Sequence, residues 1–202
     1  MGELFLIDAI GPFFRGLKKK RINWSKIPFA DLDEDPERWR LISEEMRVFC
    51  REVSALGFTA VTLDDVCHLV PHRLHTVQIA EKIAFWREQF AGFFPIICEE
   101  GLRIFLTVDV VPLTQEISDE LAGDELATQN YFCEMIRTVL ADFPQIAGII
   151  LRIGESDGKD VRDPIRSQLH IRSAAQANEM LKQLLPIFEQ AQRTLIFRTW
   201  TV

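Results

Sequence analysis

Apolar and polar residues alternate along the chain in blocks that predict strands joined by helices. Five short apolar runs are typical of buried strands; they span residues 3–11, 58–63, 102–108, 148–153 and 194–197. Each of the four segments between these runs contains a stretch with helical periodicity. These stretches cover 36–56, 77–100, 126–143 and 174–193. This strand–helix alternation predicts right-handed βαβ units and therefore a parallel sheet.

Local signals support the first helix and modify two others. Asp35-Pro36-Glu37 is typical of a helix start, and Gly57 is a typical stop. Pro95 is expected to kink the second helix, and Pro186 is expected to interrupt the fourth. Residues 12–35, between the first strand and the first helix, are expected to form a long loop.

Two architectures fit this pattern. From the second strand on, the strands start near 58, 102, 148 and 194, spaced 44 to 46 residues apart. A complete (β/α)8 barrel needs about 250 residues, whereas an open doubly wound sheet of five strands fits 202 residues. The chain ends at the fifth strand without a covering helix, so we expect one domain over 1–202, an incomplete parallel (β/α) barrel of about five βα units. The alternative is the open doubly wound sheet; strand order 1-2-3-4-5 favours the barrel type, and 2-1-3-4-5 a flavodoxin-like fold.

Composition excludes some classes of partner. The net charge of −7 and the pI of about 5.2 argue against broad nucleic-acid binding, and the basic run 18–21 is expected to be a solvated loop. No apolar stretch is long enough for a membrane span. The four cysteines form no CxxC pair, which favours reduced thiols and a cytoplasmic location. Bare edge strands would be covered by a homodimer or by a missing C-terminal half.

Charged side chains lie at or just beyond the end of every predicted strand. The candidate site residues are Asp8, Asp64, Asp65, Asp109, Arg152, Glu155, Arg198 and Trp200. In a barrel these positions converge on one mouth, where carboxylates serve acid–base chemistry, arginines hold an anionic group and an aromatic face stacks on a sugar ring. Taken singly, each acid is equally typical of a helix cap or a loop turn.

Other patterns are weaker. Cys67, His68, His72 and His75 could ligate zinc, but their spacing matches no closed structural site, and His68 or His72 is better placed to line a pocket. The chain has no phosphate-loop motif, no GxGxxG and no serine nucleophile elbow. We therefore predict no metal and no cofactor.

Several segments resemble α-glucuronidase-type glycoside hydrolases in the same order along the chain. They are 148–158 (GIILRIGESDG), 175–181 (AQANEML), 195–200 (LIFRTW), 56–65 (LGFTAVTLDD) and 101–109 (GLRIFLTVD). The resemblance implies a (β/α)8 barrel fold, with Glu155 as the general acid and with Arg152 and Arg198 holding a uronate carboxylate. The family has asparagines where this chain has Asp64, Asp65 and Asp109, and its water-activating carboxylates come from later strands.

Three functions follow as hypotheses. The first is the N-terminal part of a glycoside hydrolase barrel that acts on a glycoside, with an acidic sugar as the candidate, Glu155 as general acid and Asp109 as the conceivable second carboxylate. The isolated chain would then be weak or inactive. The second is a non-catalytic carbohydrate-binding or assembly domain. The third is an open-sheet domain that binds a small anion at a switch point.

Overall fold

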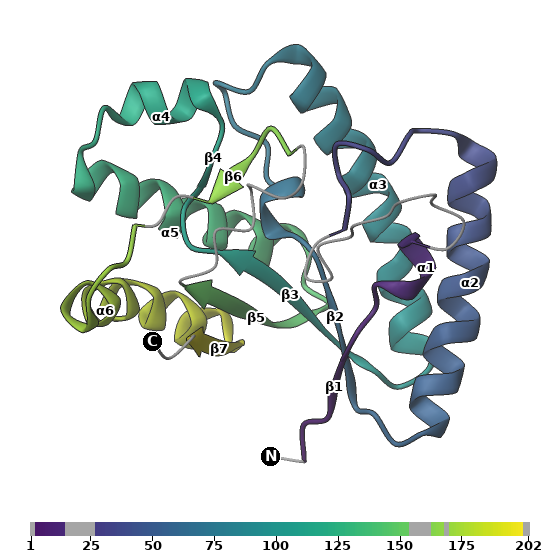
Figure 1. Cartoon of the computed structure of the whole chain (residues 1–202). Coiled ribbons are helices and arrows are strands. Elements are labelled where there is room, and N and C mark those ends of the chain that lie inside the picture. Colours follow the sequence, from purple (N-terminus) through teal and green to yellow (C-terminus); the bar gives the residue numbers. More distant parts are fainter. Residues whose placement is uncertain (1–2, 15–26, 154–162, 168–169, 200–202) are drawn as a thin grey trace.

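The computed structural model describes residues 3–14, 27–153, 163–167 and 170–199 (Figure 1). The strands are β1 Leu6–Asp8, β2 Ala60–Leu63, β3 Arg103–Asp109, β4 Pro112–Leu113, β5 Ile146–Ile153, β6 Arg166–Ser167 and β7 Thr194–Thr199. The helices are α1 Gly11–Phe14, α2 Pro36–Ala55, α3 Val77–Glu99, α4 Gln115–Leu121, α5 Glu125–Asp142 and α6 Ala174–Ala191, with a 3-10 turn η1 at Val66–His68. All four predicted long helices are present.

Polar caps explain where the long helices begin. Asp35 accepts a hydrogen bond from the backbone N–H of Glu37 at 3.0 Å, and Asp124 accepts one from the backbone N–H of Ala127 at 3.0 Å.

Helix α6 runs unbroken through Pro186, so the predicted interruption is wrong. A proline removes only one backbone hydrogen bond, and the buried face of this helix holds its last turn against the core. No helix within the described ranges is long and apolar enough to cross a membrane.

The main sheet has five parallel strands in the order β1-β2-β3-β5-β7. These strands follow one another in the sheet as they do in the sequence, which confirms the barrel-type order and excludes the flavodoxin-like order. Strands β1 and β7 are the two edges, so the described part of the chain forms an open sheet and no closed barrel.

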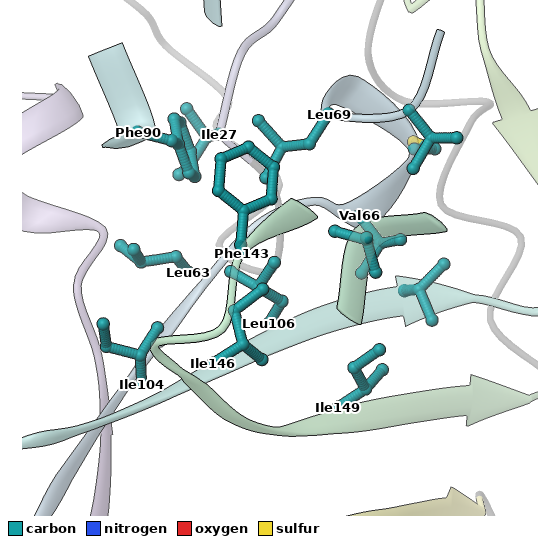
Figure 2. Packing of buried hydrophobic residues seen from close by; sticks show 14 of the residues in the cluster. Ile27, Leu63, Val66, Leu69, Phe90, Ile104, Leu106, Phe143, Ile146 and Ile149 are labelled. Carbon is teal, nitrogen blue, oxygen red and sulfur yellow. The ribbon is translucent and has the colours of Figure 1, made fainter. Parts of the chain in front are cut away.

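In the described ranges, the helices cover one face of this sheet and leave the other without a helix. The large apolar core contains strand residues such as Leu106 and Ile149 together with residues from α2, α3, α5 and α6. Figure 2 shows Leu106 and Ile149 in this core with Phe90 of α3. On the opposite face a small cluster, Ala60, Phe105 and Ile150, packs only with other strand residues in the described part of the chain. We call this opposite side the helix-free face. A doubly wound sheet has helices on both faces, so the arrangement matches the wall of a (β/α) barrel.

The sequence pattern missed the short elements. Helices α1 and α4, the turn η1, and strands β4 and β6 each contain seven residues or fewer, which is too short to show a period. Strands β4 and β6 pair antiparallel, with Pro112 opposite Ser167 and Leu113 opposite Arg166. This small ribbon joins the segment after β3 to the segment that returns after β5.

Gly148 is required where β5 passes β3 and β7. A Cβ atom there would collide with the carbonyl oxygen of Thr194 and lie 2.6 Å from Cε1 of Phe105. We expect Gly148→Ala to lower the free energy of unfolding by about 1–3 kcal/mol, as overpacking does. The control is Gly92→Ala in α3, where a Cβ meets nothing within 4 Å and should stabilise by about 0.5–1 kcal/mol. Urea unfolding of both variants tests this; equal stabilities would contradict it.

Candidate functional site

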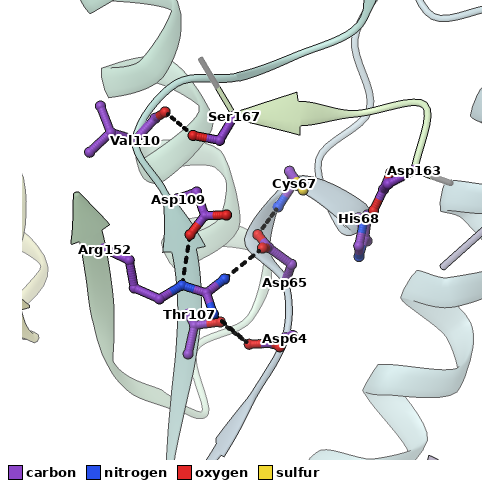
Figure 3. Close-up of polar contacts among 10 residues, drawn as sticks. All are labelled: Asp64, Asp65, Cys67, His68, Thr107, Asp109, Val110, Arg152, Asp163 and Ser167. Carbon is purple, nitrogen blue, oxygen red and sulfur yellow. Dashed lines mark hydrogen bonds and ion pairs between the residues drawn. The ribbon is translucent and has the colours of Figure 1, made fainter. Parts of the chain in front are cut away.

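Four charged residues meet in the interior at the carboxyl ends of three neighbouring strands (Figure 3). Asp64 and Asp65 follow β2 directly, Asp109 ends β3, and Arg152 lies near the end of β5. The exposed fractions are 5% for Asp64, 0% for Asp65, 0% for Asp109 and 2% for Arg152. We call these four residues the Asp–Arg cluster.

The guanidinium of Arg152 forms an ion pair with each of the three carboxylates. Its Nε lies 2.7 Å from Oδ1 of Asp109, its Nη2 lies 3.4 Å from Oδ2 of Asp65, and its Nη1 lies 3.8 Å from Oδ1 of Asp64. Asp109 and Arg152 are also direct register partners in the β3–β5 ladder. Because guanidinium donors point outward in a planar fork, one arginine can join the ends of three strands.

Neutral donors fix the orientation of two of the carboxylates. The hydroxyl of Thr107, in β3, donates to Oδ1 of Asp64. The backbone N–H of Cys67 donates to Oδ1 of Asp65 at 3.1 Å, because Asp65 caps the turn η1. Removing charges from water costs several kcal/mol per ion, and such hydrogen bonds are what makes burial tolerable. The Asp–Arg cluster is therefore a fixed arrangement.

The remaining candidate residues differ in position and access. Asp8 ends β1, is exposed, and accepts a hydrogen bond from the hydroxyl of Thr62 in β2. Arg198 in β7 is half-buried and is the register partner of Arg152, so it lies on the same side of the sheet. Glu155 and Trp200 lie outside the described residues. The structure thus brings Asp64, Asp65, Asp109 and Arg152 into contact. It places Asp8 in β1 and Arg198 in β7, the two strands that flank β2, β3 and β5, at the same carboxyl ends.

His68, the last residue of η1, forms a buried pair with Asp163 that the sequence analysis did not predict. Nε2 of His68 lies 2.8 Å from Oδ2 of Asp163, and both side chains are buried. The ring of His68 stacks on Phe29, with centroids 4.1 Å apart. Oδ1 of Asp163 accepts from the backbone N–H of Ile165 at 2.9 Å. The sequence singled out His68 as a pocket residue, but nothing in the chain indicates a partner 95 residues away.

The cysteine and histidines considered for zinc separate in the structure. His68 faces Asp163, whereas His72 and His75 lie in the loop before α3. The backbone N–H of His72 donates to Nδ1 of His75 at 3.2 Å, and that of Leu74 donates to Nδ1 of His72 at 3.3 Å. The described ranges contain no group of three or more side chains arranged to hold a metal ion.

Comparisons with known proteins support the fold. No family model matches this chain, and no curated protein matches its sequence. A solved GH138 enzyme targeting pectin rhamnogalacturonan II is similar in fold, with a TM-score of 0.53 and 12% identity, over 78% of this chain and 18% of that chain. This chain therefore spans less than a fifth of that enzyme.

Two other solved structures match with TM-scores below 0.5. A GH5_18 protein from Streptomyces cattleya in complex with GlcNAc gives 0.45 at 18% identity, over 78% of this chain and 39% of that one. A GH36 α-galactosidase from Geobacillus stearothermophilus in complex with stachyose gives 0.49 at 14% identity, over 98% of this chain and 28% of that one. The GH138 similarity supports the (β/α) barrel-type fold alone and does not single out the α-glucuronidases.

Removing one charge from the Asp–Arg cluster should destabilise the protein strongly. Asp109→Asn keeps the shape of the side chain but weakens the shortest ion pair of Arg152. We expect the free energy of unfolding to fall by about 3 kcal/mol, as for other broken buried ion pairs. The control is Asp119→Asn, an exposed position in α4, which should change it by less than about 0.5 kcal/mol. If chemical denaturation gives the same change for both variants, the cluster does not stabilise the fold.

Protonation of His75 should destabilise the loop before α3. Burial, and then the charge of His72, lower the pKa of His75 from 6.5 to about 4, while Glu116 acts in the opposite direction. The folded state therefore favours the neutral ring, so this contribution to stability is present above pH 6.5 and is lost as the pH falls towards 4. In thermal unfolding over this range, the wild type should lose more stability than His75→Asn, whose amide oxygen can still accept from His72. Parallel curves would contradict the prediction.

Proposed function

We propose that the carboxyl-end edge of the sheet binds a glycoside and that this chain is a domain of glycoside hydrolase type. The observation behind the proposal is the gathering of charged side chains from all five strands of the sheet at this edge, in a barrel-type sheet whose other face carries the helices. Active sites of (β/α)8 barrel enzymes lie at the carboxyl ends of the strands.

The charged groups at this edge differ in solvent exposure and therefore in the role that each can have in binding. The Asp–Arg cluster is shielded from solvent and fixes the strand ends, so its role in binding is to position neighbouring groups. Asp8 and Arg198 are accessible, and both point to the helix-free face in register with the cluster strands. An arginine can bind a carboxylate through two parallel hydrogen bonds, which favours an acidic sugar as the ligand. By its place in the sequence, Trp200 is the candidate for stacking on the ring.

Hydrolysis requires two carboxyl groups. The resemblance in sequence assigns the general acid to Glu155, three residues after Arg152. Inverting glycosidases need a second carboxylate about 6.5–9.5 Å away, and retaining ones about 5–5.5 Å away. By sequence Asp109 is the conceivable second carboxylate because it ends the strand next to β5, but it is fully buried and paired with Arg152, so it is poorly placed to act on a substrate.

A non-catalytic carbohydrate-binding or assembly domain is the second candidate. The observation that favours it is the ion pairing of Arg152 with three acids, Asp64, Asp65 and Asp109, because this arrangement engages these charges inside the protein. In an assembly, the open edges at β1 and β7 would be covered by a homodimer or by the C-terminal half of a barrel.

Calorimetry with methyl glucuronide and methyl glucoside, together with hydrolysis of 4-nitrophenyl α- and β-glucuronides, tests both candidates. Arg198→Gln should weaken glucuronide binding roughly 10- to 100-fold, the value of a charged hydrogen bond, and leave glucoside binding unchanged. Glu155→Gln should abolish hydrolysis and keep binding. The control is Glu179→Gln, an exposed position in α6, which should behave as wild type.

Each outcome separates the hypotheses. Binding of either sugar without any hydrolysis by the wild type favours the non-catalytic domain. Hydrolysis that persists in Glu155→Gln overturns the role of that residue. The absence of binding to either methyl glycoside, in a protein whose thermal unfolding is cooperative, contradicts a site for simple acidic or neutral sugars at this edge.

A further inference from the structure

A cavity lies apart from the Asp–Arg cluster, on the outer side of the loops that follow β2 and β3. Its volume is about 430 Å³, it is partly open to solvent, and it is lined by the loop 70–74 and by helices α4 and α5. No member of the Asp–Arg cluster lines it. Its deep wall is apolar and includes Val70, Ile117, Leu121 and Met135. A cavity of this size with a mainly apolar lining is typical of small-molecule sites.

One face of α5 forms the long wall of this cavity. The lining residues Ala127, Tyr131, Met135 and Thr138 recur at helical spacing, so the wall extends over three turns. The eleven steps from Ala127 to Thr138, at a rise of about 1.5 Å each, give a length of roughly 16 Å. The cavity is therefore elongated and matches a flat or extended molecule better than a compact one.

Polar contacts hold the walls of the cavity in place. Arg73 in the loop forms an ion pair with Glu120 in α4, with Nη2 and Oε1 2.7 Å apart. The hydroxyl of Tyr131 donates to the carbonyl of Pro112 at 3.2 Å. Farther along α5, Arg87 of α3 lies 2.8 Å from a carboxylate oxygen of Asp142. These contacts connect the loop to α4, and α5 to β4 and α3.

The rim of the cavity has balanced charge. Glu120 pairs with Arg73, and Glu134 pairs with Arg137 at 3.3 Å. Because each carboxylate already has a cationic partner, the rim favours a neutral ligand over a cation. His72 meets Tyr131 edge to face, with centroids 5.4 Å apart, and burial lowers the pKa of His72, which keeps the ring neutral at neutral pH. Two aromatic rings at a charge-balanced rim and an apolar deep wall suit an uncharged aromatic molecule.

We propose that this cavity is a binding site for a neutral, largely aromatic small molecule, separate from the glycoside site. The site needs no residue of the Asp–Arg cluster and stands whether or not the chain binds sugars. Its ligand would lay a ring against the wall formed by Tyr131 and Met135 and present a polar end to Asn130 at the mouth.

Methyl NMR with ¹³C-labelled methionine tests the site in the whole chain. Met135 lines the cavity, whereas Met46 in α2 and Met180 in α6 are buried elsewhere in the core and serve as internal references. Titration with N-phenyl-1-naphthylamine, an uncharged aromatic probe, should shift the Met135 signal saturably and leave the signals of Met46 and Met180 unchanged.

Filling the cavity should remove the effect. Ala127→Phe places a ring inside the cavity, and Asn130→Trp blocks its exposed mouth without changing a buried position. Each should weaken binding of the probe at least tenfold. The control is Ala141→Phe, at an exposed position of the same helix that does not line the cavity, which should bind as wild type. Wild-type affinity in both filled variants, or equal shifts of all three methionines, would overturn the proposal.

Discussion

The ion pairs of Arg152 connect the ends of the three central strands, and the rest of the carboxyl-end edge is arranged around them. The guanidinium lies between Asp109 of β3 and the two acids that follow β2. Burying four charges is costly, and the cost is tolerable only when each charge has partners at hydrogen-bonding distance. This requirement fixes the register of β3 and β5 near their ends and orients the start of η1 through Asp65.

The helix-free face gives this edge its chemical character. Because the long helices all pack against the other side, side chains on the helix-free face are contributed by the strands themselves. Near the middle of the strands this face is apolar, with Phe105 and Ile150, and at the carboxyl ends it becomes charged. In a parallel sheet with helices on both faces, an apolar layer would cover this region. The one-sided architecture thus leaves room for charged groups at the strand ends, which is where enzymes of the (β/α)8 class place their sites.

The two proposed sites make different demands on the protein. The glycoside site depends on charged groups at the sheet edge, where Asp8 and Arg198 are accessible beside a buried ionic support. The cavity between α4 and α5 depends on shape and on apolar lining, with its charges balanced at the rim. The glycoside site is formed mainly by the carboxyl ends of the strands, whereas the cavity is formed by a loop and two helices that follow β2 and β3.

The sequence by itself determined the five strands of the main sheet, the long helices and their parallel arrangement, because apolar periodicity and polar caps such as Asp35 and Asp124 act within a few residues along the chain. It also placed acids at the strand ends. Only the tertiary structure decided which of them are buried around Arg152 and which, like Asp8, face solvent, because that depends on how neighbouring strands align. The pairing of His68 with Asp163 and the cavity beside α5 have the same origin: they join segments far apart in the sequence, and contacts of that kind leave no periodic signal in it.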